Sequence, residues 1–157
     1  MTPVGIVIHH TAGNETSAAQ LRAIFKSRFG INFIGYHRVI SKTGEVWSDI
    51  PLTKQGVHNS GGRLNNTNSV GISVVGNFEE TSPTQKQLEV LTAQVRSVAK
   101  EFGIKASNIV GHRDMKSTAC PGKNLYKLLP TIINNAFQEE SMNWEQYAKE
   151  QEKLADD

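Results

Sequence analysis

The chain has 157 residues, 38% hydrophobic and 20% charged, a composition that excludes an intrinsically disordered chain and fits one globular domain. A single cysteine excludes a disulfide within the chain, no apolar stretch approaches the roughly 20 residues that span a membrane, and the first residues do not resemble a signal peptide. The net charge of +2 divides into −5 on residues 139–157 and +7 on residues 1–138, and a cationic domain attracts anionic polymers.

The pattern of apolar residues predicts strands that alternate with helices. Unbroken or alternating apolar runs are typical of strands, whereas apolar residues three or four positions apart are typical of helices. In chain order we expect a strand at residues 5–9, a helix at 17–29, a hairpin of strands at 36–40 and 45–47, a long surface loop at 48–68, a strand at 70–75, a helix at 83–102, a strand at 109–111 and a helix at 125–137. This alternation favours an α/β fold, a single domain in which helices flank a central mixed β-sheet.

Capping signals mark the helix ends. Two Ser-x-x-Gln pairs have the spacing of a capping box, Ser17 with Gln20 and Ser82 with Gln85. Pro83 suits the first position of a helix, whereas Gly30 and Gly103 are typical of the residue that ends one. Pro130 is expected to kink or split the last helix.

The chain divides by composition into a domain and a tail. Residues 1–138 are expected to form the folded domain, and residues 139–157 an acidic C-terminal tail. Residues 143–154 have only a thin apolar face, so the tail is expected to be a peripheral helix or a linker.

Two histidine segments and the lone cysteine predict a zinc site. His9 and His10 end the first strand, His112 follows the strand at 109–111, and Cys120 precedes a Pro-Gly turn. Two imidazoles and one thiolate are zinc ligands that leave a fourth tetrahedral position open, as hydrolytic zinc sites do. Because successive side chains of a strand point to opposite faces, only one of His9 and His10 can easily face the ion.

Each of these residues alone has a simpler interpretation. A histidine at a strand end is commonly a hydrogen-bonded structural group, and a free cysteine such as Cys120 behaves as a small hydrophobic residue. The combination of the three favours a metal site that holds one Zn²⁺ ion.

Four segments of the chain resemble a known enzyme family. They are IVIHHTA at 6–12, IGYHRVI at 34–40, SVGISVVGN at 69–77, and GHRD at 111–114 with TACPG at 118–122. In this order they resemble the zinc-dependent N-acetylmuramoyl-L-alanine amidases of the type-2 amidase family, which includes a phage lysozyme and the peptidoglycan recognition proteins. The resemblance covers about residues 4–137 and implies that His9, His112 and Cys120 are the zinc ligands, with His10 structural.

The resemblance also implies two catalytic residues, Tyr36 and Thr118. A phenol such as Tyr36 near an open zinc position can donate a hydrogen bond to a developing oxyanion or orient the attacking water, although an aromatic residue at a strand start also suits simple packing. Thr118 stands where some members carry lysine and others threonine, so this chain has no positive charge there.

Loop residues supply the candidates for substrate binding. His58 resembles a family histidine that lines the substrate groove, and Arg63 and Asn68, with the neighbouring Asn66, are candidates to read the peptide or the muramic acid. Each of them also suits an ordinary solvated loop. His37 is expected to be structural. Asp114 is expected to orient a ligand histidine or to pair with its neighbour in sequence.

The function that the resemblance implies is hydrolysis of the amide bond between N-acetylmuramic acid and L-alanine in bacterial peptidoglycan. The expected partner is peptidoglycan, with no nucleic acid and no membrane, and the chain is expected to be a monomer. Without a signal peptide, it is expected to be made in the cytoplasm and to act on the cell wall as a phage endolysin released through a holin, or to be a recycling enzyme.

Three other functions remain open at this point. One is a non-catalytic peptidoglycan-binding module on the same fold, in which the cysteine position is commonly lost, whereas Cys120 is retained here. Another is a cysteine amidase with Cys120 as nucleophile and His112 as base. The third, binding to a polymerase by analogy with the phage lysozyme, has no residue that supports it.

Overall fold

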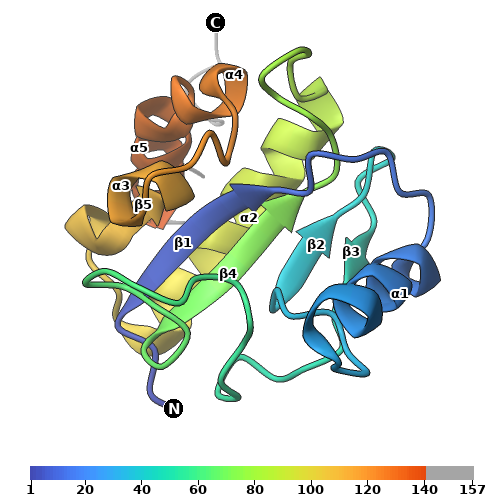
Figure 1. Ribbon diagram of the computed structural model, residues 1–157. Coiled ribbons are helices and arrows are strands. Elements are labelled where there is room, and N and C mark those ends of the chain that lie inside the picture. Colours follow the sequence, from blue (N-terminus) through green and yellow to red (C-terminus); the bar gives the residue numbers. More distant parts are fainter. Residues whose placement is uncertain (141–157) are drawn as a thin grey trace, which may run out of the picture.

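The computed structural model describes residues 1–140 and shows strands and helices in near alternation (Figure 1). The expected peripheral helix at 143–154 lies outside the described residues. In chain order the elements are β1 Gly5–His10, α1 Ala18–Phe29, β2 Arg38–Ile40, β3 Val46–Trp47, β4 Ser69–Val74, α2 Gln85–Phe102, the 3-10 turn η1 Ala106–Asn108, β5 Ile109–Gly111, α3 His112–Met115, α4 Lys123–Tyr126 and α5 Leu129–Glu140.

The five strands form one mixed sheet in the order β3-β2-β4-β1-β5. The central strand β1 runs parallel to both of its neighbours, β4 and β5, and β2 runs parallel to β4. Only the hairpin of β2 and β3 is antiparallel. The α/β fold with a central mixed sheet flanked by helices is therefore confirmed.

Helices cover both faces of this sheet. Helices α2 and α5 pack together on one face, and α1 lies on the other (Figure 1). The larger core fills the α2 side, and a smaller one lies under α1. The residues of the smaller core are Leu21, Phe25, Ile34, Val39 and Val75.

The alternation along β1 sends its two histidines to opposite sides. His9 is level with Ser73 of β4, which is level with Val39 of the smaller core, so these three side chains share the α1 face. His10 is level with Val74, which belongs to the larger core, and therefore lies on the α2 face. The strand thus delivers one imidazole to each side of the sheet.

Helix α1 begins and ends where the sequence predicts. The Ser17 side chain accepts a hydrogen bond from the backbone of Gln20, and Gly30 ends the helix in the left-handed region at φ 69°. The expected capping box is only half formed, because the Gln20 side chain accepts from the backbone N–H of Thr16, at 2.7 Å, instead of from Ser17.

Helix α2 begins two residues later than the sequence predicts. Its N-cap is Thr84, in a complete capping box with Gln87, so the expected box of Ser82 with Gln85 is wrong. The Gln87 side chain also donates to the carbonyl of Val75 at 2.9 Å, a tertiary contact that favours the later start. The helix ends at Gly103, as expected.

The C-terminal helix predicted at 125–137 is split into α4 and α5, as Pro130 led us to expect. Pro130 occupies the first turn of α5, where its missing N–H leaves no bond unmade. His112 was expected in a loop after the strand at 109–111, but it is the first residue of the single turn α3.

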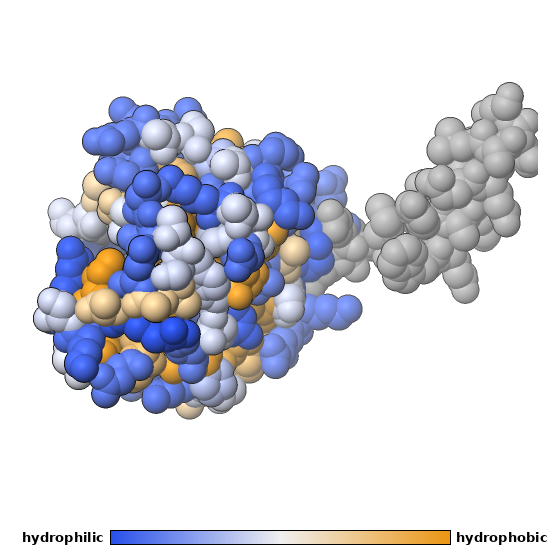
Figure 2. Space-filling model, turned by 90° about the vertical axis from the view of Figure 1, so that its right-hand side faces the viewer, coloured by the Kyte–Doolittle hydropathy of each residue, from blue (hydrophilic) through white to orange (hydrophobic). Residues whose placement is uncertain are grey.

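The surface of the described residues is mixed. Hydrophilic side chains surround small hydrophobic areas on the face shown in Figure 2. Within residues 1–140, no helix has the length and hydropathy needed to cross a membrane.

Candidate metal centre

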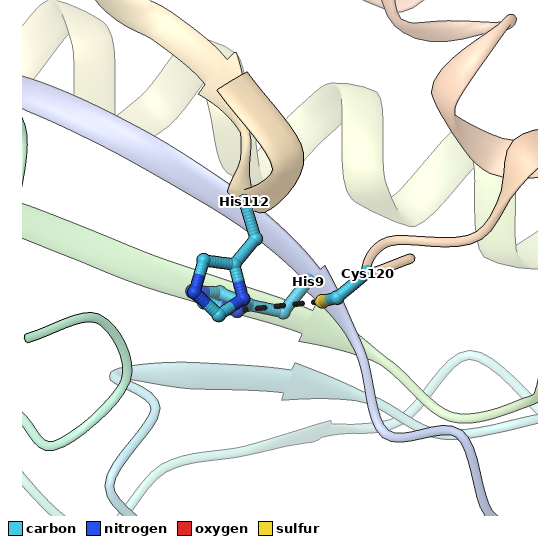
Figure 3. A group of neighbouring side chains, drawn as sticks. All are labelled: His9, His112 and Cys120. Atoms are coloured by element: carbon cyan, nitrogen blue, oxygen red, sulfur yellow. Dashed lines mark hydrogen bonds between the residues drawn. The ribbon is translucent and has the colours of Figure 1, made fainter. Parts of the chain in front are cut away.

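Two regions that are distant in sequence, the end of β1 and residues 112–120, bring His9, His112 and Cys120 together (Figure 3). His9 comes from the C-terminal end of β1, His112 from the start of α3, and Cys120 from the loop between α3 and α4. The three potential ligand atoms all lie within 4.8 Å of one another, and Cys120 Sγ is 3.6 Å from His9 Nδ1.

His9 is a buried residue of β1, and its imidazole is uncharged. Its Nε2 lies 2.9 Å from His58 Nδ1, and its ring is 4.6 Å from that of His112, centroid to centroid. Burial, followed by the nearby His58 and His112, lowers the pKa of His9 well below its ordinary value. The imidazole therefore presents a lone pair at neutral pH, as a metal ligand must.

His112 carries a buried nitrogen that is not hydrogen-bonded. Among residues 1–140, its Nε2 has no hydrogen-bond partner although it is shielded from solvent. Burial lowers the pKa of this histidine too, and the neighbouring Lys116 lowers it further. Figure 3 shows the other ring nitrogen of His112, Nδ1, on the side of Cys120, so Nδ1 is the atom placed to share an ion with His9 and Cys120.

Asp114 takes neither of the two roles expected of it. It accepts a hydrogen bond from the backbone N–H of Gly111 at 2.9 Å and another from the hydroxyl of Tyr126. It therefore closes the turn of α3 from which His112 projects. Arg113, its expected partner, instead pairs with Glu79 at 3.1 Å.

Cys120 is held by backbone contacts at the end of β1. Its sulfur accepts a hydrogen bond from the backbone N–H of His10 at 3.4 Å, and its own N–H donates to Thr118 Oγ1 at 3.3 Å. Burial raises the pKa of the Cys120 thiol to about 12. A divalent cation displaces the proton of such a thiol when it binds, and becomes the partner of the buried thiolate.

The donor types of these three residues suit a zinc ion. Zinc bonds of about 2.1 Å to nitrogen and 2.3 Å to sulfur place neighbouring donors of a tetrahedron roughly 3.5 Å apart. The separation of 3.6 Å between Cys120 Sγ and His9 Nδ1 agrees with this spacing. Two neutral imidazoles and one thiolate are also the donor set of a three-ligand zinc site with one open position.

His9, His112 and Cys120 line a cavity of about 680 Å³. Helix α1 forms one wall, and the loops around residues 57–60 and 112–120 form the other. Of the residues expected to act on or bind substrate, Tyr36, Thr118 and His58 line it. Its α1 wall includes Ile24 and Phe29, whose side chains are exposed.

Tyr36 lines this cavity and lies beside His9. The two ring centroids are 5.0 Å apart, and the phenol ring also meets Phe25 edge to face at 5.3 Å. Burial and the neighbouring Cys120 raise the pKa of Tyr36 well above its ordinary value. The phenol therefore remains a hydrogen-bond donor at neutral pH. The sequence predicts Tyr36 within a strand at 36–40, but β2 begins at Arg38, so Tyr36 precedes it.

His10 and His37 have structural contacts. His10 Nδ1 accepts from the backbone N–H of Phe78 at 3.1 Å. His37 Nδ1 accepts from the backbone N–H of Gly71 at 3.0 Å, and its Nε2 donates to the carbonyl of Lys54 at 2.6 Å. Both rings thus join strands to loops through backbone groups.

Arg63 and Asn68 lie away from the cavity. Arg63 donates to Asn108 Oδ1 at 2.5 Å, and the Asn68 carbonyl accepts from the backbone N–H of Val4 at 2.8 Å. Val4 precedes β1, whereas His9 is near the C-terminal end of that strand. Arg63 and Asn68 therefore lie at the opposite end of the strands from His9. Asn66 does line the cavity, but its side-chain oxygen accepts from two backbone N–H groups.

Charged residues that the sequence did not single out also line the cavity. Glu15 is buried, and its Oε1 has no hydrogen-bond partner in the described part of the chain. Its other carboxylate oxygen lies 2.0 Å from where a Cβ on Gly13 would be, so the glycine makes room for it. Arg28 and Lys116 add positive charge to the lining. No local pattern distinguishes these three from ordinary surface charges.

Comparisons with known proteins agree on one family. The model of the N-acetylmuramoyl-L-alanine amidase family matches residues 1–123. Peptidoglycan-recognition protein SC2 of Drosophila melanogaster is 31% identical over 137 residues, which cover 82% of this chain and 73% of that protein. A peptidoglycan recognition protein of Trichoplusia ni is 32% identical over 130 residues, covering 77% and 70%.

A solved structure shows the same fold. N-acetylmuramoyl-L-alanine amidase LysC from Clostridium intestinale URNW aligns with a TM-score of 0.77 at 32% identity, over 85% of this chain and 87% of that one. Drosophila peptidoglycan recognition protein SD aligns with a TM-score of 0.70 at 29% identity, over 82% and 80%.

Proposed function

The chain belongs to the N-acetylmuramoyl-L-alanine amidase family, and from that premise we propose that it is a zinc-dependent hydrolase. Its substrate is the amide bond between N-acetylmuramic acid and L-alanine in bacterial peptidoglycan. Its action is lysis of the cell wall, as in an endolysin.

One observation carries this proposal. His9, His112 and Cys120 place two nitrogens and a sulfur within 4.8 Å of one another, at the wall of a cavity of about 680 Å³. Three ligands leave a fourth position for reactant, and the cavity gives a polymer strand access to it.

Each residue of the site has its own role in the proposed reaction. A zinc ion bound at this site would be the Lewis acid that activates water and polarises the scissile carbonyl. His9 and His112 hold the metal as neutral ligands, and Cys120 as a thiolate. Tyr36 donates its O–H to the oxygen on which negative charge develops. Thr118 lines the same cavity, and its hydroxyl is a second, neutral donor.

The cysteine-nucleophile alternative does not suit this geometry. Reactive cysteines have lowered pKa values, whereas burial raises the pKa of Cys120. The hydrogen-bond partners of the thiol are His9 and His10, not the His112 that this mechanism needs as a base.

The experiment that tests the proposal is digestion of defined muropeptides, with and without a chelator, followed by mass analysis of the products. We expect cleavage between muramic acid and L-alanine, its loss with the chelator and its recovery with added zinc. Cys120→Ser should lose both zinc and activity. Ser117→Ala, a change of similar size in the same loop, should keep both.

Two outcomes would contradict the proposal in different ways. A chain that binds zinc and muropeptides but releases no new amino groups would be a binding module, like relatives that are named for recognition. Cleavage that is insensitive to the chelator but stopped by alkylation of Cys120 would instead indicate the nucleophile mechanism.

A further inference from the structure

His58 is a buried histidine that contacts the metal centre without belonging to it. It lies in the loop between β3 and β4, and its ring meets that of His9 edge to face, with centroids 5.0 Å apart. Its Nδ1 lies 2.9 Å from His9 Nε2, and its Nε2 lies 3.2 Å from the carbonyl oxygen of Ser69. The proposed reaction assigns it no part, although both of its ring nitrogens are engaged.

The direction of these hydrogen bonds follows from their last acceptor. A carbonyl oxygen can only accept, so His58 Nε2 carries the proton. The other nitrogen of a neutral imidazole is then an acceptor, and His58 Nδ1 accepts from His9 Nε2–H. His9 Nδ1 is then the unprotonated nitrogen, and it lies 3.6 Å from Cys120 Sγ, where its lone pair accepts from the thiol.

The ring of His58 is fixed by the fold itself. A Cβ on Gly71 would lie 2.6 Å from His58 Cγ, so the ring rests directly on the backbone of β4. Asn66 Oδ1 accepts from the backbone N–H of His58 at 2.7 Å and anchors the loop. The glycine in a central strand is thus the place where the ring approaches the backbone closely.

We propose that His58 is a positioning residue that selects the Nε2-protonated tautomer of His9 and so presents His9 Nδ1 to zinc. This inference rests on the proposed zinc site. It replaces the expectation that His58 reads substrate, because its two ring nitrogens are already bonded within the protein. Partners of this kind orient metal-ligating histidines, and their loss lowers metal affinity by about ten- to a hundredfold.

The first test measures zinc affinity by competition with a chelator of known affinity. His58→Phe keeps a ring of similar size but removes both hydrogen bonds, and should lower zinc affinity by about ten- to a hundredfold. His58→Gln keeps one donor and one acceptor on a planar group, and should recover part of the loss.

The matched control is His37→Phe. His37 is also buried, and its ring lies 5.8 Å from that of His58, but its bonds go to the backbone of Gly71 and Lys54. It should therefore leave zinc affinity nearly unchanged. An equal loss in both Phe variants would mean general loosening of the fold and would overturn the inference.

A second measurement needs no variant and stands even if His58→Phe does not fold. Long-range ¹H–¹⁵N correlation spectra of the zinc-loaded wild-type chain report which nitrogen of each imidazole carries the proton. His9 should be protonated at Nε2 and coordinated through Nδ1. Coordination of His9 through Nε2 would overturn the inference.

These results separate the two proposals. A wild-type chain that binds no zinc overturns the metal site and the role of His58 together. A wild-type chain that binds zinc, with an affinity that His58→Phe leaves unchanged, overturns the role of His58 alone.

Discussion

Burial sets the protonation states around the candidate metal centre. His9 and His112 have lowered pKa values because burial disfavours their charged forms, so both rings are neutral donors of a lone pair near pH 7. The pKa of Tyr36 is raised for the same reason, which keeps its proton in place. One cavity therefore holds two neutral imidazoles beside a phenol that can donate a hydrogen bond.

Replacing Tyr36 by Phe tests this donor. The variant should lower kcat on muropeptides roughly a hundredfold, the loss typical when one oxyanion donor is removed. Zinc content, measured by atomic absorption, should not change, because the phenol is not a ligand. Wall lysis at the wild-type rate would remove Tyr36 from the mechanism.

Asp49 joins two segments that build the α1 side of the site. Its carboxylate accepts from the Arg22 guanidinium of α1 at 2.7 and 2.8 Å and from the backbone N–H of Ile34 at 2.9 Å. Hydrogen bonding from Arg22 lowers the pKa of Asp49 below its ordinary value of 3.8. The contact therefore stabilises the fold fully at pH values above 3.8. This stabilisation is lost as the pH falls through the lowered pKa of Asp49.

Asp49→Ala should consequently lower the free energy of unfolding at pH 7. The Ile34 N–H loses its acceptor, which contributes on the order of 1 kcal/mol. Urea titrations should show the difference from wild type shrinking as pH falls below about 4. A difference that grows toward low pH would contradict the assignment. Substitution of the exposed Glu101 in α2 serves as a control.

The start of α2 depends on a contact beyond the helix itself. Ser82 with Gln85 and Thr84 with Gln87 both have capping-box spacing, so local sequence does not choose between them. The structure uses the second pair, in which the buried Gln87 amide also donates to the carbonyl of Val75. A helix start and a strand end are therefore joined through one side chain.

Thr84→Ala should lower the free energy of unfolding by about 1 kcal/mol, since it removes the N-cap acceptor. Ser82→Ala is the matched control, and should change it by less than about 0.5 kcal/mol because Ser82 is exposed and precedes the helix. Chemical denaturation of the two variants measures both values. A larger effect of Ser82→Ala would restore the earlier helix start.

Local pattern predicts the main elements well. Unbroken apolar runs locate β1 and β4 to within one residue at each end, and Gly30 and Gly103 end α1 and α2 as expected. The signals fail where tertiary contacts decide, as at the start of α2. They also fail at His112, where the Asp114 side chain closes a helical turn.

The candidate site was harder to predict than the fold. Residue types suggest a metal site, but it was the resemblance that selected His9 over His10 and pointed to Tyr36. Arg63 and Asn68 were chosen from a long irregular loop, and no periodicity shows which end of the sheet each part of such a loop approaches. Glu15 gave no signal, because burial of a single carboxylate depends on the assembled cavity.

The net charge of the domain affects how strongly it is attracted to an anionic polymer. Residues 1–138 carry 15 basic and 8 acidic groups, and Arg28 and Lys116 bring part of this charge to the cavity. A positive domain is drawn to an anionic wall by long-range attraction, which salt screens over about 10 Å at 0.1 M and about 3 Å at 1 M.

The rate of wall lysis should therefore fall several-fold as sodium chloride rises from about 0.05 to 0.5 M. Hydrolysis of a short, uncharged muropeptide should change little, since it depends on the site and not on attraction to a polymer. Turbidity of cell walls and mass analysis of the muropeptide supply the two rates. Equal sensitivity in both assays would show that salt acts on the site itself.

The central position of β1 has a consequence for how the chain is made. The strand leaves the ribosome before either neighbour exists, and its apolar core of Ile6, Val7 and Ile8 is fully covered only once β4 and β5 have been synthesised. Cys120 follows His9 by 111 residues, which takes roughly 5 to 20 s of translation at ordinary rates. Cys120 can therefore join His9 only when nearly the whole domain has been synthesised.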